Sequence, residues 1–131
     1  MTPATEVLLI SHHPGHGKLL SEMLRSVSIS VEQVRRLKDA RRRVHRGAYS
    51  VVLTEASLPD GTWHEVVDLV GELNSKVIVT HPHADPRLWV EVLNRGAYDF
   101  IAQPFAATEV QRILGNACSH DSLISKRVRA G

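Results

Sequence analysis

Residues 49–61 read YSVVLTEASLPDG, and the architecture of the chain follows from this segment. Residues 51–53 are apolar at successive positions, so both faces of this strand need cover, as in the centre of a parallel sheet. Polar residues 54–55 follow at its carboxyl end, and a turn with Pro, Asp and Gly comes at 59–61. Two further wholly apolar runs lie at 7–10 and 77–79. The sequence therefore predicts a parallel sheet with a covered centre.

Two weaker strand patterns complete the predicted sheet. Residues 27–34 alternate apolar and polar positions, which indicates an exposed edge strand. Residues 98–102 form a fifth short candidate. Between these strands, apolar residues recur at helical spacing, which predicts five helices. The apolar stripes of these helices begin at Leu19, Leu37, Val66, Leu88 and Val110.

Strand and helix alternate five times, which predicts an α/β fold with helices on both faces of a doubly wound sheet. We expect the folded domain to span 1–118 and residues 119–131 to form a C-terminal tail or the start of a linker. Functional groups in such sheets gather at the carboxyl ends of the strands. The segments placed there are residues 11–16, 54–64, 80–85 and 102–105.

Three segments stand out in order along the chain: residues 8–14 (LLISHHP), 49–61 (YSVVLTEASLPDG) and 96–105 (GAYDFIAQPF). Together they resemble the response-regulator receiver domain of the chemotaxis type. In that family the first ends in two acids, the second carries a phosphoacceptor aspartate four residues before the proline, and the third ends in Lys-Pro-Phe. The resemblance implies a flavodoxin-like sheet of five strands in the order 2-1-3-4-5, with five helices, over about residues 6–117.

The residues at the family's site positions depart from this pattern. The resemblance places Glu55 at the acceptor, Ser11 and His12 at the acid pair, and Gln103 at the lysine, while the hydroxyl of Thr80 is kept. One carboxylate therefore stands where three are expected, although magnesium prefers several oxygen ligands. A longer carboxylate also loses the in-line geometry of phosphoryl transfer. We expect no magnesium, no cofactor and no regulated phosphorylation.

The predicted function is therefore that of an atypical receiver in two-component-type signalling that acts by protein–protein contact. The fourth helix holds more apolar residues than one buried stripe requires, and Trp89 and Leu93 are expected to face the fifth strand with Phe100. The family uses this surface for output. We expect it to bind a protein partner or a second copy in a homodimer, with Trp89 as anchor.

Two alternatives stay open at this point. The first is a metal or pH sensor, because histidines gather at one rim of the sheet and suit zinc. The zinc candidates are His12, His13, His81 and His83. The second alternative is a phosphoacceptor that uses the unusual residues themselves. A zinc titration and a titration with a phosphoryl mimic and magnesium would separate these hypotheses.

Bulk composition excludes several other classes. The longest apolar runs of the 131 residues are far short of a membrane span, and the single Cys118 permits no internal disulfide, which fits a reducing cytoplasm. Net charge is only +2, and the basic cluster at 35–46 is expected to form a solvated helix face, so no direct nucleic-acid contact is expected. A docking patch for an acidic partner or nucleic acid is the alternative for this cluster. No motif supports a catalytic triad or an activated cysteine, so the chain is not expected to be an enzyme.

Overall fold

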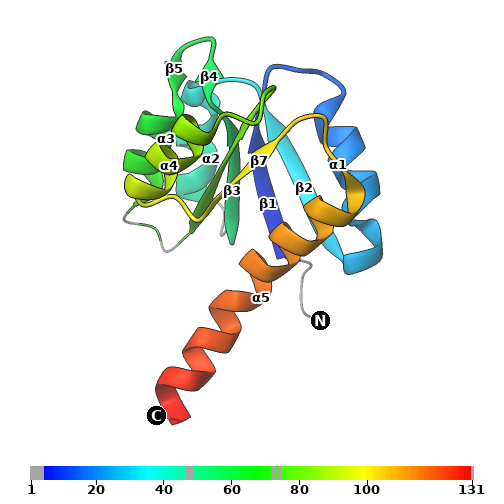
Figure 1. The fold of residues 1–131 in the computed structure, drawn as a ribbon, viewed down its shortest axis with the longest axis vertical. Helices are drawn as coiled ribbons and strands as arrows, with labels where there is room; N and C mark the ends of the chain where they lie inside the picture. The colour runs from blue at the N-terminus through cyan, green and yellow to red at the C-terminus, as the bar shows by residue number, and fades with distance from the viewer. Residues whose placement is uncertain (1–4, 47–48, 72, 74, 131) are drawn as a thin grey trace.

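The computed structural model describes residues 5–46, 49–71, 73 and 75–130, and describes side chains over the same ranges except for 5–6, 46 and 119–130. The central sheet has five parallel strands in the order β2-β1-β3-β6-β7 (Figure 1). These strands are β1 (Thr5–Ile10), β2 (Ile29–Val34), β3 (Val51–Glu55), β6 (Lys76–His81) and β7 (Asp99–Ala102). The predicted order is confirmed, since a small hairpin takes the labels β4 and β5.

Five helices cover the two faces of the sheet, as predicted. Figure 1 shows α2 (Leu37–Arg46), α3 (Trp63–Val70) and α4 (Pro86–Asn94) on one face. Helices α1 (His16–Leu24) and α5 (Ala107–Ala130) cover the other. The alternation of side chains along a strand divides the core accordingly. Leu8 and Ile10 pack toward α2–α4, whereas Val7 and Leu9 pack toward α1 and α5, and all four are fully buried.

Three local features differ from the sequence predictions or add to them. The edge strand begins at Ile29 rather than at Val27, because a 3₁₀ turn (Arg25–Val27) and the left-handed Ser28, with φ 58°, precede it. Val27 is consequently 41% exposed. A two-stranded hairpin, β4 (Ser57–Leu58) with β5 (Gly61–Thr62), follows β3 and was not predicted, since two residues per strand leave no periodicity. The Gln103–Pro104 peptide is cis.

The last helix continues past the boundary that was predicted at residue 118. Helix α5 runs to Ala130 and extends beyond the edge of the sheet (Figure 1). Its packed part contributes Val110, Leu114 and Ala117, which are completely buried. Side chains from 119 onward lie outside the description, so a separate tail or linker remains a prediction. Among the described residues, no helix combines the length and the apolar character that crossing a membrane requires.

Hydrogen bonds at helix starts fix the loops that carry polar residues. Asp60, in the turn of the hairpin, accepts hydrogen bonds from the backbone N–H groups of Leu37 at 2.7 Å and Lys38 at 3.0 Å. It thus caps α2 from a distant part of the chain. Asp85 caps α4 by accepting from the N–H of Arg87 at 3.0 Å, with Pro86 in the first turn. Gly96 lies two residues after the end of α4 and has φ 98°, a conformation that favours glycine.

Candidate functional site

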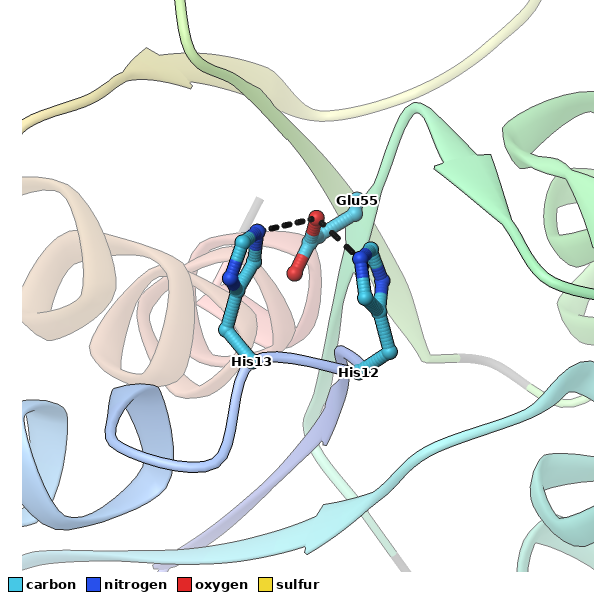
Figure 2. A group of neighbouring side chains, drawn as sticks. All are labelled: His12, His13 and Glu55. Carbon is cyan, nitrogen blue, oxygen red and sulfur yellow. Dashed lines mark ion pairs between the residues drawn. The ribbon is translucent and has the colours of Figure 1, made fainter.

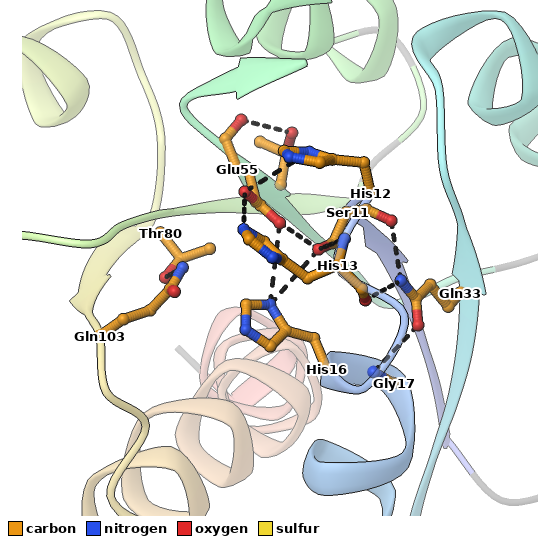
Figure 3. Close-up of polar contacts among 10 residues, drawn as sticks. Ser11, His12, His13, His16, Gly17, Gln33, Glu55, Thr80 and Gln103 are labelled. Carbon is orange, nitrogen blue, oxygen red and sulfur yellow. Dashed lines mark hydrogen bonds and ion pairs between the residues drawn. The ribbon is translucent and has the colours of Figure 1, made fainter. Parts of the chain in front are cut away.

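The candidate site lies where β1 and β3 end, and its centre is the carboxylate of Glu55. Glu55 is the last residue of the fully covered strand β3 and is only 5% exposed. The loop after β1 folds over it and brings Ser11, His12 and His13 against the carboxylate (Figures 2 and 3). His16, the first residue of α1, approaches from the same loop. The structure therefore assembles one buried acid within a ring of imidazoles.

The two carboxylate oxygens have different surroundings. Oε1 lies 3.9 Å from Nδ1 of His12 and 3.7 Å from Nε2 of His13. Oε2 accepts a short hydrogen bond from the hydroxyl of Ser11 and lies 3.7 Å from Nδ1 of His16. Ser11 is completely buried, and its oxygen also accepts from the backbone N–H of His13 at 3.1 Å. Ser11 therefore fixes the orientation of the carboxylate, so that Oε1 faces the two exposed histidines.

The imidazoles pack against one another as well as against Glu55. The rings of His12 and His13 are stacked with centroids 4.5 Å apart, and those of His13 and His16 are 4.6 Å apart. His16 also meets the edge of Phe105. Burial lowers the pKa of His16, the neighbouring His13 lowers it further, and Glu55 opposes this shift. His16 therefore favours its neutral form, in which a ring nitrogen keeps a free lone pair.

Gln33 holds the loop in place, and sequence reasoning missed this residue. From the edge strand β2, its Nε2 donates to the carbonyl oxygens of Ser11 at 2.7 Å and His13 at 2.9 Å. Its Oε1 accepts from the backbone N–H of Gly17 at 2.9 Å. A Cβ atom at residue 17 would collide with the Gln33 side chain, which accounts for the glycine. Figure 3 shows Gln33 between the loop and Gly17. A single polar residue in an edge strand gives no sequence pattern that would predict these contacts.

Thr80 and Gln103, the other predicted site residues, form a separate pair beside Glu55. Thr80 is completely buried on β6, next to Glu55 in the register of the sheet. Gln103 follows β7, and its Nε2 donates to Oγ1 of Thr80 at 3.2 Å. All five predicted site residues therefore lie at one end of the sheet, in two groups. One group is Glu55 with Ser11 and His12, and the other is Thr80 with Gln103.

The four zinc candidates do not come together. His12 and His13 belong to the Glu55 cluster, and one ligand atom from each of these three residues lies within 4.8 Å of the others. His81 and His83 instead contact each other on the loop after β6, where Nδ1 of His81 accepts from the N–H of His83 at 3.1 Å. In the described part of the chain, no other group of three His, Cys, Asp or Glu side chains has such geometry.

The predicted interaction surface is exposed at its centre. Trp89 is 50% exposed and Leu93 42%, and Val90 beside them is 57% exposed. Phe100 is only half-buried and packs against the core. Trp89 and Phe100 line a groove of about 430 Å³ between α4, β7 and α5. Its lining includes the charged residues Asp85, Asp99, Glu109 and Arg112.

The basic cluster at residues 35–46 forms ion pairs with neighbouring acids. The cluster lies on α2 and the turn before it, where Arg43 pairs with Glu32 and Arg41 lies 4.0 Å from Glu65. Arg46 lies outside the described side chains.

Burial raises the pKa of the Cys118 thiol, and Lys76 opposes this shift. A raised pKa is the opposite of what an activated cysteine requires.

Comparison with known proteins identifies the family to which this fold belongs. The family model for the response regulator receiver domain matches residues 7–114, so the chain belongs to the response regulator receiver domain family. Receiver domains are signalling modules of two-component systems and are in general not enzymes.

Individual relatives agree with this assignment. Over 114 residues the chain is 24% identical to the response regulator protein PilR of Pseudomonas aeruginosa, with 86% of the chain matched but only 26% of PilR. It resembles the solution structure of the beryllofluoride-activated NtrC4 receiver domain dimer, with a TM-score of 0.80, 22% identity and 88% and 97% of the two chains covered. It also resembles the receiver domain of sensor histidine kinase PA1611 from Pseudomonas aeruginosa PAO1, solved with magnesium in its active site cleft. For this pair of structures the TM-score is 0.75 and the identity 25%, with 88% of this chain and 98% of the PA1611 receiver covered.

Proposed function

We propose that this chain is a receiver that signals through protein–protein contact and is not regulated by phosphorylation. The observation that carries the proposal is the composition of the Glu55 pocket. The three positions that the resemblance assigns to acids hold Ser11, His12 and Glu55, so only one carboxylate remains. Magnesium requires oxygen-rich ligation, and the imidazoles beside Glu55 offer nitrogen instead. The PA1611 receiver, by contrast, was solved with magnesium in its cleft.

The position of Glu55 also argues against its use as a nucleophile. One oxygen, Oε2, is already engaged by Ser11 and approached by His16, while Oε1 faces the imidazoles of His12 and His13. An attacking oxygen must face the phosphoryl donor in line, with cations to neutralise the developing charge. Gln103, bonded to Thr80, supplies no such cation. We expect no catalytic turnover from this chain.

For the contact surface we propose the α4–β7 face, with a second copy of the chain as its partner. Three adjacent apolar side chains of α4 are exposed to 42–57%, which is unusual unless a partner covers them. The groove beside them carries both acids and an arginine, so the same face offers charges of both signs for contacts between two copies. The NtrC4 receiver, which has a similar fold, was solved as a dimer.

One experiment tests both parts of this proposal. The purified chain is incubated with a small-molecule phosphodonor and magnesium, and its intact mass and sedimentation are measured before and after. We expect no mass gain and an unchanged monomer–dimer equilibrium. A stoichiometric gain of one phosphate that Glu55→Gln abolishes would overturn the first part. A chain that stays monomeric at high micromolar concentration would overturn the second.

A further inference from the structure

We propose that His12, His13 and Glu55 form a binding site for a divalent transition-metal ion of the zinc class. This site goes beyond the proposed contact function and does not depend on it. Two imidazole nitrogens and one carboxylate oxygen are a common zinc ligand set when a fourth position is left open. One ligand atom from each residue already lies within 4.8 Å of the other two (Figure 2).

The ligand atoms are close enough for side-chain rotation to bring them onto one ion. Zinc binds nitrogen and oxygen at about 2.0–2.2 Å, so two ligand atoms of a tetrahedral site are about 3.4 Å apart. The oxygen Oε1 of Glu55 lies 3.9 Å from Nδ1 of His12 and 3.7 Å from Nε2 of His13. The histidine side chains are 46% and 47% exposed, so both can rotate although their rings stack on each other. The two contacts to Oε1 must each shorten by a few tenths of an ångström. The two imidazole nitrogens, which lie within 4.8 Å of each other, must also approach by rotation of the exposed side chains.

The surroundings of the three ligands favour this arrangement over a chance encounter of side chains. Glu55 is fixed by the covered strand β3 and by the Ser11 hydroxyl on Oε2, which leaves Oε1 for the metal. Gln33 holds the carbonyl groups on both sides of His12, so the backbone that carries the two histidines is fixed in place. Loss of such supporting hydrogen bonds commonly lowers metal affinity by about tenfold or more.

The ligand chemistry selects the class of ion. Magnesium and calcium require several oxygen ligands, whereas imidazole with carboxylate suits zinc and its transition-metal neighbours. His16 faces the other carboxylate oxygen, so it stands beside the proposed site rather than in it. His12 and His13 are 46% and 47% exposed, so a solvent molecule would complete the four ligands. A metal there ties the loop after β1 to the end of β3.

The test is zinc titration of the full chain without a histidine tag, in phosphate-free buffer at neutral pH. We expect one zinc per chain by calorimetry, a dissociation constant in the micromolar range, a raised melting temperature, and reversal by chelator. Cobalt added in place of zinc should give visible absorption bands typical of mixed nitrogen and oxygen ligation. Magnesium at the same concentration should give no heat.

Variants decide whether the ion binds at these residues. His12→Gln with His13→Gln should weaken zinc at least tenfold and, because both side chains are exposed, should leave the circular dichroism spectrum unchanged. The matched control is His81→Gln with His83→Gln, which removes two neighbouring histidines from another loop and should leave the affinity as it was. Ser11→Ala should weaken zinc without removing a ligand.

Three results would overturn the site. They are zinc affinity unchanged in the His12 and His13 variant, loss of affinity in the His81 and His83 control, or no binding at high micromolar zinc. A chain that binds zinc at this site and is also phosphorylated would refute the proposed function alone. The two proposals therefore fail separately.

Discussion

Gln103 donates a hydrogen bond from its Nε2 to Oγ1 of Thr80 at 3.2 Å, across the ends of β7 and β6. The resemblance to receiver domains places a lysine at residue 103 and a hydroxyl at residue 80. In this chain the hydroxyl is therefore bonded to a neutral amide from its own sheet. The bond ties the hydroxyl on β6 to the residue that follows β7.

This bond predicts measurable coupling between the two residues. Thr80→Val and Gln103→Ala should each lower the free energy of unfolding, and the double variant should lose less than the sum. A net coupling of about 1 kcal/mol is expected for a partly buried neutral hydrogen bond. Urea denaturation of the four proteins gives this quantity. Strict additivity would mean that the hydrogen bond contributes nothing to stability.

Magnesium binding should appear only when acids are restored. The chain itself should give no heat with magnesium at millimolar concentration, because Glu55 has imidazoles and a serine as neighbours. The variant Ser11→Asp, His12→Asp, Glu55→Asp places three carboxylates at the family's positions and should bind magnesium at least tenfold more tightly. Calorimetry on both proteins is the measurement. Equal binding by both would show that these positions do not control magnesium.

Trp89→Ala should weaken self-association while leaving the monomer folded. Trp89 is half exposed, so its loss costs little core packing, whereas an interface tryptophan typically contributes on the order of 2 kcal/mol or more. The dimer should therefore weaken by roughly thirtyfold or more. Sedimentation and circular dichroism on the same samples measure the two effects. Leu19→Ala is the matched control, since Leu19 is 39% exposed on α1 and should leave association unchanged. If Trp89→Ala is folded and associates normally, the surface is assigned wrongly.

Asp60 should make stability depend on pH through its cap of α2. The slight desolvation of this exposed residue would raise its pKa. Hydrogen bonds from the N–H groups of Lys38 and Leu37 and from its own, with the charge of Arg36, nevertheless hold the pKa below the ordinary value of 3.8. A carboxyl with a depressed pKa stabilises the folded state above its unfolded pKa, and this contribution is lost as pH falls through the folded value. Above pH 5, Asp60→Ala should cost about 0.5–2 kcal/mol.

The cost of Asp60→Ala should shrink as pH is lowered below 3.8, where the cap becomes protonated. Urea denaturation of both proteins from pH 7 to pH 3 measures this change. Asp60→Asn keeps a hydrogen-bond acceptor without the charge. Its free energy of unfolding should lie between those of the unchanged chain and Asp60→Ala, and its cost should depend little on pH. A cost that is the same at every pH would show that the charge of Asp60 plays no part in the cap.

The strand runs and the helical stripes were enough to predict the sheet and the covering of both faces, whereas the strand order came from the resemblance to receiver domains. Residues 7–10, 51–53 and 77–79 are apolar at every position, and only a doubly covered strand tolerates this. The start of β2 was predicted two residues early, because Val27 continues the alternation although the chain turns at Ser28. Periodicity does not register a single left-handed residue.

For the site, the sequence by itself determined which residue types stand at the rim: Glu55, Ser11 and His12 follow strands whose carboxyl ends must meet at one edge. Only the tertiary structure decided how they divide. It joined His13 and His16 to Glu55, set His81 and His83 apart, and revealed Gln33 as the residue that holds the loop. The reason is physical. Strand order fixes the backbone position of each side chain, but the contacts that the side chain makes depend on loop paths and rotamers, which leave no periodic pattern in the sequence.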